Sequence, residues 1–136
     1  MYETFDHTAD VGIRARAADL ASLFRDAAQG LFALIAEPVA AAPSARRVEL
    51  EVRGERADLL LFDWLSELLY LSERDRSILC DFAVELIEGG LRGRATAVPM
   101  EQARDALLRE VKAITYHGLR VERAGAEWIA EFIVDV

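Results

Sequence analysis

The stretch ADLLLFDWLSELLYLSE, residues 57–73, decides the fold class of this chain of 136 residues. It is apolar on most sides, and its few polar positions recur at helical spacing, at Asp63, Ser66, Glu67 and Tyr70. We therefore predict a central helix, with this narrow polar strip as its solvated face.

An earlier helix is predicted to begin at Leu20, because the apolar positions that follow keep one stripe facing a core. Asp19, just before it, is the expected N-cap. Pro38 and Pro43 bound an alanine-rich linker, and proline cannot continue a helix. This helix should therefore end near Glu37.

Strand patterns fill most of the remaining chain. The segment RVELEVR, residues 47–53, alternates apolar and charged positions, as a half-buried strand does. A Gly-Gly turn at 89–90 predicts a hairpin of strands 77–88 and 91–98, and Gly125 predicts another of 113–122 and 127–136. The order of elements indicates an α+β fold, with two helices packed on mostly antiparallel β-sheet in one compact domain, residues 1–136.

Length, composition and charge narrow the class of protein. With 136 residues, of which 53% are hydrophobic, the chain has room for one core and enough apolar surface to offset the entropy of folding. The formal net charge of −8 repels a phosphate backbone and so disfavours direct nucleic-acid binding. The same acidity fits a protein that docks on a basic partner, or one kept soluble by surface carboxylates.

Two features bear on where the protein works. Cys80 is the only cysteine, so it cannot form an internal disulfide, and the alternating apolar run 78–86 predicts that it faces the core. The opening MYETFDHTAD lacks the pattern of a signal peptide, and no apolar stretch approaches the ~20 residues of a membrane span. We expect a cytoplasmic protein without a membrane segment.

The first group of polar residues with no evident role in the core lies in HTADVGI, residues 7–13. His7, Thr8 and Asp10 stand at the mouth of a strand that continues through Val11 and Ile13. The more ordinary interpretation is a turn in which Thr8 or Asp10 caps nearby backbone amides. The functional alternative is a carboxylate, with an imidazole beside it, held for a metal.

A second polar group closes the chain in FIVDV, where Asp135 supplies a side-chain carboxylate and Val136 the terminal one. Two adjacent acidic groups are unfavourable unless water or a cation neutralises them. Chain ends usually fray, but the strand-like apolar residues here predict a pinned end. The pair then offers oxygen ligands for a hard cation such as Ca²⁺ or Mg²⁺.

A third group lies in KAITYHGL, residues 112–119, where Lys112 and His117 interrupt a strand-like run. Tyr116 and His117 should point to opposite faces, so one of them is expected to be exposed. A lone histidine is more often structural than catalytic. We find no nucleophile arrangement, zinc-type spacing or phosphate-binding loop, so the residues give no independent argument for an enzyme.

Four segments together resemble the archease family, namely HTADVGI, LLLFDWLSELLYLSE, EVKAITYHGL and FIVDV, in the order and spacing of that family. They span almost the whole chain. The resemblance implies a fold of two helices against antiparallel sheet, in agreement with the periodicity.

The same resemblance implies a function. Archeases are non-enzymatic activators of the RtcB-type tRNA ligase, which joins RNA ends through a guanylylated histidine and Mn²⁺. They promote guanylylation and multiple turnover of the ligase in tRNA splicing or RNA repair, and they broaden its nucleotide use. The implied partner is thus an RtcB-type RNA ligase, while the net charge and the lack of an apolar span lead us to expect no direct binding to nucleic acid or membrane.

The resemblance also assigns residues. The family's bound cation would be held by Asp10, Asp135 and the terminal carboxylate of Val136, with Ca²⁺ the expected ion and Mg²⁺ or Mn²⁺ the alternatives. Supporting or partner-contacting roles carry over to His7, Lys112 and His117.

Two other functions stay open. One is a small metal-dependent hydrolase that uses Asp10, His7 and Asp135 on a phosphate or amide. The other is a chaperone-like modulator of tRNA-modifying enzymes.

Overall fold

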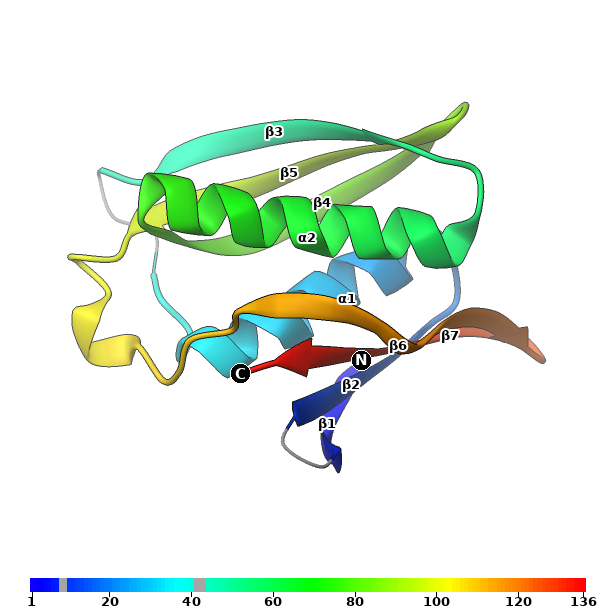
Figure 1. Cartoon of the computed structure of the whole chain (residues 1–136). Helices are drawn as coiled ribbons and strands as arrows, with labels where there is room; N and C mark the ends of the chain where they lie inside the picture. Colours follow the sequence, from blue (N-terminus) through cyan, green and yellow to red (C-terminus); the bar gives the residue numbers. More distant parts are fainter. Residues whose placement is uncertain (8–9, 41–43) are drawn as a thin grey trace.

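Two antiparallel sheets and two α-helices make up the computed structural model, which describes residues 1–7, 10–40 and 44–136 (Figure 1). The four-stranded sheet has the order β1-β2-β7-β6, formed by β1 (Tyr2–His7), β2 (Asp10–Ala17), β7 (Glu127–Asp135) and β6 (Ala113–Ala124). The three-stranded sheet has the order β3-β5-β4, formed by β3 (Arg46–Arg53), β5 (Gly90–Pro99) and β4 (Ser77–Ile87). The helices are α1 (Leu20–Ile35), α2 (Ala57–Asp75) and a short 3₁₀ helix, η1 (Arg104–Ala106).

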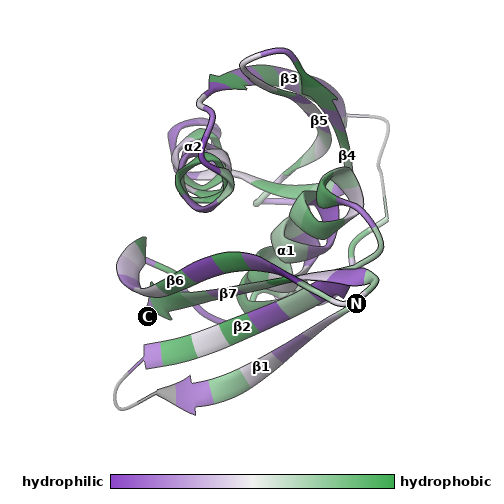
Figure 2. Cartoon of the chain, turned by 90° about the vertical axis from the view of Figure 1, so that its right-hand side faces the viewer, coloured by the Kyte–Doolittle hydropathy of each residue, from purple (hydrophilic) through white to green (hydrophobic). Residues whose placement is uncertain are grey.

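The two α-helices lie between the sheets, as Figure 2 shows. Helix α1 contacts β2 of one sheet and β4 of the other, and α2 contacts β6 as well as all three strands of the smaller sheet. This arrangement confirms the predicted α+β class, with two helices on antiparallel sheet. The division of the strands into two separate sheets was not predicted.

The sequence signals at the ends of α1 are confirmed. Asp19 accepts a hydrogen bond from the backbone N–H of Ser22 at 2.8 Å, which satisfies one of the free donors at the helix start. The helix ends at Ile35, two residues before the predicted Glu37, and Ala36 donates its N–H to the carbonyl of Phe32.

Helix α2 is central to the core. The indole of Trp64 is fully buried, and its Nε1–H donates to the carbonyl of Phe24 in α1 at 3.0 Å. Asp63, Glu67 and Tyr70 are exposed and Ser66 is half-buried, so the predicted polar strip is the solvated face. The helix runs to Asp75, slightly beyond the predicted end.

The prediction that Cys80 faces the core is wrong in part, because it is only half-buried. Asp81 has a left-handed φ of 52°, and the pairing of β4 with β5 shifts register between Cys80 and Ala83. This bulge breaks the strict alternation on which the prediction rested. Leu79 is therefore buried as well, and Leu86 is 40% exposed.

No helix in the part of the chain that the structure describes is long and apolar enough to cross a membrane.

Candidate metal and partner site

Acidic residues from both ends of the chain meet at one end of the four-stranded sheet. Strands β2 and β7 pair antiparallel, with Val11 opposite Val134. Asp10 directly precedes Val11, and Asp135 directly follows Val134, so the two aspartates stand on neighbouring strands. Figure 1 shows how these strands, β2 and β7, lie in the sheet. We call Asp10, Asp135 and Val136 the acidic end.

Both aspartates of the acidic end occupy positions on the same face of the sheet. Ile13 and Val134 are fully buried on the side that faces the helices. Because side chains alternate along a strand, Asp10 and Asp135 belong to the opposite, outer side. Asp10 is half-buried and Asp135 exposed, and no basic group among the described residues lies within ion-pair distance of either.

The end of the chain is pinned, as predicted. Asp135 lies opposite Ala113 of β6, and its carbonyl accepts the N–H of Lys112 at 2.8 Å. Val136 is half-buried and packs against the core. The backbone at the acidic end is therefore held in place, while the side chain of Lys112 is exposed beside it.

The donors at the acidic end suit a hard cation. Among the described residues, no group of three or more His, Cys, Asp or Glu side chains could hold a metal ion. Asp10 and Asp135 supply two side-chain carboxylates, and the carboxylate of Val136 stays the third ligand that the sequence resemblance predicts. An all-oxygen set of this kind fits Ca²⁺ or Mg²⁺. The side chain of His7 and the whole of Thr8 lie outside the described part of the chain.

Strand β6 contains a large bulge that was not predicted. Thr115 lies opposite Ile133 and Arg120 opposite Glu131, so residues 116–119 face a single residue of β7. Gly118 takes a left-handed φ of 71° inside this bulge, a conformation that glycine adopts without strain. The alternation therefore fails here, and both Tyr116 and His117 are exposed where only one was expected to be.

The bulge places Tyr116 on helix α2. Its ring stacks on that of Phe62, with centroids 3.9 Å apart and planes 13° apart. Tyr116 nevertheless remains 64% exposed. His117 lies in the same bulge and is exposed, and among the described residues it joins Asp10 and Asp135 in no metal-binding group. Sequence reasoning missed the stacked pair, because an exposed tyrosine in a strand-like run carries no signal of its partner.

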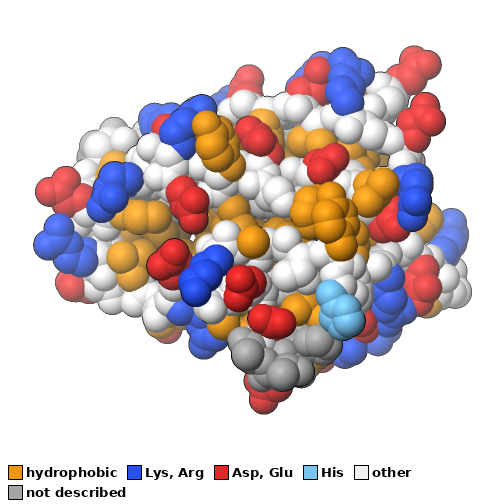
Figure 3. Space-filling model, viewed as in Figure 1, with side chains coloured by type: hydrophobic (Ala, Val, Ile, Leu, Met, Phe, Trp, Pro, Cys, Tyr) orange, Lys and Arg blue, Asp and Glu red, His pale blue; other side chains and the backbone are white. Residues whose placement is uncertain are grey.

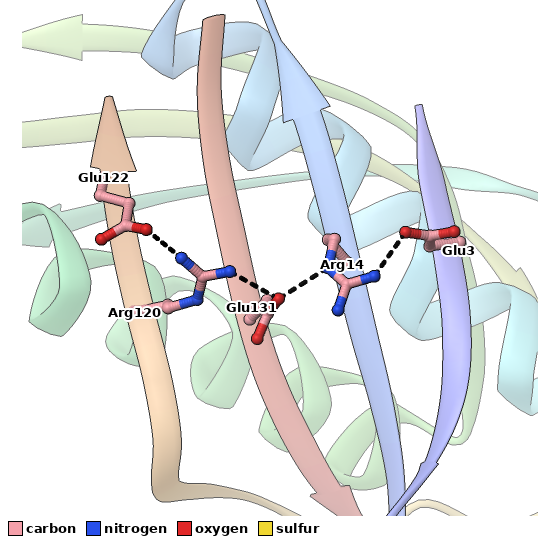
Figure 4. A network of polar contacts seen from close by, with 5 residues as sticks. All are labelled: Glu3, Arg14, Arg120, Glu122 and Glu131. Carbon is pink, nitrogen blue, oxygen red and sulfur yellow. Dashed lines mark hydrogen bonds and ion pairs between the residues drawn. The ribbon is translucent and has the colours of Figure 1, made fainter. Parts of the chain in front are cut away.

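A row of alternating charges crosses the outer face of the same sheet (Figure 4). One carboxylate oxygen of Glu131 accepts from Arg14 Nε at 2.6 Å and from Arg120 at 2.7 Å. Arg14 also donates to Glu3 at 2.7 Å, and Arg120 pairs with Glu122. The row joins all four strands, and we call these five residues the charge ladder.

The charge ladder fixes the ionisation of its central carboxylate. Hydrogen bonds from Arg120 and Arg14 hold the pKa of Glu131 at about 2, well below its usual range. The same contacts raise the pKa of Arg14, whose guanidinium lies 5.1 Å from the centroid of the Phe5 ring. Arginine and glutamate at outward strand positions were visible in the sequence, but their pairing requires the register of four strands.

Fold and site together define a small α+β protein in which two helices lie between antiparallel sheets and acidic residues from both termini meet. Residues 2–136 match the model of the archease protein family (MTH1598/TM1083), and the chain belongs to that family.

Relatives and solved structures agree with this assignment. The chain is 38% identical to protein archease of Methanopyrus kandleri over 99% of each chain. It is 34% identical to protein archease of Pyrococcus furiosus over 99% of this chain and 98% of that protein.

Among solved structures, protein 1598 of Methanobacterium thermoautotrophicum superposes with a TM-score of 0.74 at 30% identity, covering 99% of this chain and 98% of that one. An archease of Thermotoga maritima, described as a possible chaperone, gives a TM-score of 0.70 at 18% identity, covering 100% and 98%. The second likeness concerns the fold alone.

Proposed function

We propose that this chain is a non-enzymatic, metal-binding activator of an RtcB-type RNA ligase in the cytoplasm, where it promotes guanylylation and multiple turnover of the ligase. Membership of the archease family supports this role. The observation that carries the proposal is the meeting of Asp10 and Asp135 on neighbouring strands of a fixed backbone.

The proposed activity requires a cation at the acidic end. Carboxylate oxygens bind hard divalent ions, and Ca²⁺ is the first candidate, before Mg²⁺ and Mn²⁺. A cation held there would let an otherwise acidic end approach the ligase active site, where metal and nucleotide are organised. His7, Lys112 and His117 are proposed to support this end or to contact the partner.

The test measures guanylylation of the purified ligase with Asp10→Ala and Asp135→Ala. We expect either change to lower the stimulation at least tenfold, because each removes one of two side-chain ligands. Asp105→Ala, at an exposed aspartate of η1, is the matched control and should stimulate like wild type. Full stimulation by both correctly folded ligand variants would disprove the metal-dependent role.

The terminal ligand can be tested separately by calorimetric titration with Ca²⁺. Adding two residues after Val136 moves the terminal carboxylate away, so we expect calcium affinity to fall several-fold. Equal affinities of the extended and unextended protein would count against the role of Val136.

A second candidate function is that of a chaperone-like modulator of tRNA-modifying enzymes, which the description of the Thermotoga maritima relative as a possible chaperone favours. Suppression of the ligase's aggregation without any change in its guanylylation rate would support this candidate over the activator. Turnover of phosphoesters by the protein alone would instead support a hydrolase.

A further inference from the structure

The exposed face of α2 beside the β6 bulge has the composition of a protein-binding surface. Tyr116 and Phe62 form its aromatic centre. Leu59 is 39% exposed, and it lies one turn before Phe62 and Asp63, on the same side of the helix. Aromatic side chains such as tyrosine are enriched in protein interfaces, and tyrosine is among the residues that contribute most to binding there.

The bulge holds Tyr116 in a fixed position. On one side the tyrosine ring stacks on Phe62 of α2. On the other side the backbone of Gly118 approaches Ile133, such that a Cβ built on Gly118 would lie 3.0 Å from Ile133 Cδ1. A side chain that is ordered before binding loses less conformational entropy when a partner covers it.

The surface is acidic as well as aromatic. Asp63 and Glu67 follow Phe62 on the exposed side of α2. Within the part of the chain that the structure describes, neither has a basic group at ion-pair distance. Unpaired carboxylates around an aromatic centre favour a partner that presents arginine or lysine, because opposite charge steers association and a cation can also bind an aromatic ring.

The acidic end lies near this surface, around the edge strand β6. Ala113 lies opposite Asp135, and Tyr116 follows only three residues later on β6, roughly 10 Å along the strand. Figure 3 shows a hydrophobic patch over α2 and β6 on the face that also carries a histidine and several acidic side chains. A single partner that reaches around the edge strand β6 can therefore cover the aromatic centre and contact the acidic end together.

We propose that Tyr116, Phe62, Asp63 and Glu67 form the docking surface for a basic, arginine- or lysine-bearing face of the partner ligase. The inference rests on the proposed function and adds that binding and activation depend on different residues. The docking surface supplies affinity, and the acidic end supplies activation.

Binding of the full-length protein to the purified ligase, measured by calorimetry, tests this assignment. We expect Tyr116→Ala and Asp63→Lys each to weaken binding at least tenfold, while Tyr116→Phe, which keeps the stacked ring, binds within threefold of wild type. Tyr70→Ala is the matched control, since Tyr70 is 55% exposed on α2 but is already contacted by Arg74. It should bind within twofold of wild type.

Guanylylation assays separate docking from activation. Tyr116→Ala should raise the concentration that gives half-maximal stimulation and leave the maximum unchanged, whereas Asp10→Ala should lower the maximum. Wild-type affinity of folded Tyr116→Ala and Asp63→Lys, or an equal loss in Tyr70→Ala, would overturn the docking surface alone. If the wild-type protein itself does not bind the ligase, both the proposed function and the docking surface fail.

Discussion

The two sheets of this protein differ in where a glycine allows a close contact. The three-stranded sheet approaches α2 so closely that Gly93 of β5 packs against Trp64, and a Cβ built on Gly93 would lie 2.2 Å from the indole. In the four-stranded sheet the comparable close contact is on the outer face. There a Cβ on Gly12 would lie 2.1 Å from the ring of Phe5, which is only half-buried.

The sheets also differ in how they hold charge. In the four-stranded sheet Glu131 binds two arginines with its side chain only 17% exposed. In the three-stranded sheet Glu51 also pairs with two arginines, Arg53 at 2.9 Å and Arg92 at 3.5 Å, but its side chain is 39% exposed. Ion pairs gain strength as water is excluded from them, so the ladder should contribute more to stability.

These contrasts indicate which sheet of the fold can carry a functional site. The three-stranded sheet consists of the β4–β5 hairpin and the added strand β3, and it packs on the helices. The four-stranded sheet joins the two ends of the chain through β2 and β7, and it leaves an open acidic end and an interrupted edge strand. Stability of that sheet must then come from elsewhere, and the charge ladder provides part of it.

Substitution of the two glycines should give the largest contrast. We expect Gly93→Ala to lower the free energy of unfolding by about 3 kcal/mol, because the fully buried Trp64 cannot move without opening the core. Gly12→Ala should cost about 1 kcal/mol, since the half-buried Phe5 ring can turn toward solvent. Urea denaturation measures both values.

The control for these glycine variants is Gly54→Ala, where the nearest side-chain atom is Leu60 Cδ1 at 3.6 Å. It should change stability by less than about 0.5 kcal/mol. Equal costs at Gly93 and Gly12 would show that the two sheets tolerate added volume alike.

Removing the central carboxylates should give a smaller contrast. We expect Glu131→Gln to cost on the order of 1–2 kcal/mol, because two arginines lose the negative charge of their shared acceptor. Glu51→Gln should cost less than about 0.5 kcal/mol, because its pairs are more open to water. Thermal or urea unfolding measures the free energy of unfolding of both variants. A larger loss in Glu51→Gln than in Glu131→Gln would contradict this prediction.

Much of the fold follows from periodicity and turn residues. Both helices, the N-cap at Asp19 and both hairpins after residue 77 depend on neighbours in sequence, and the structure confirms them. The division into two sheets could not be predicted, because a strand pattern reveals which face is apolar but not which distant strand it pairs with. The pairing of β2 with β7 is of this distant kind.

The candidate site was predictable in part. The polar residues of HTADVGI and FIVDV already pointed to Asp10 and Asp135, and the resemblance assigned both to one cation. The register of β2 and β7 places the two residues on neighbouring strands, while the cation itself stays a prediction. The β-bulges were not predictable from the alternation of apolar and polar residues. A left-handed Asp81 in β4 and the extra residues after Thr115 in β6 shift side chains between faces, and alternation assumes an unbroken strand.

The smallest expected effect is a dependence of stability on acid pH. The pKa of Glu131 is about 2 in the folded protein against an ordinary value of 4.5, so its ion pairs stabilise the fold fully only above about pH 4.5. As the pH falls from 4.5 toward 2, the unfolded state takes up a proton before the folded state does, and this stabilisation is lost. Its size is about 1 kcal/mol, because the ladder is partly open to solvent.

Urea titrations at pH 6, 4 and 3 would reveal the loss as a shrinking difference between wild type and Glu131→Gln. Glu51→Gln provides the comparison, since its difference from wild type should stay near zero at all three pH values. The two glutamates differ chiefly in exposure, so a difference between wild type and Glu131→Gln that did not shrink would show that the ladder stabilises the sheet by packing rather than by charge.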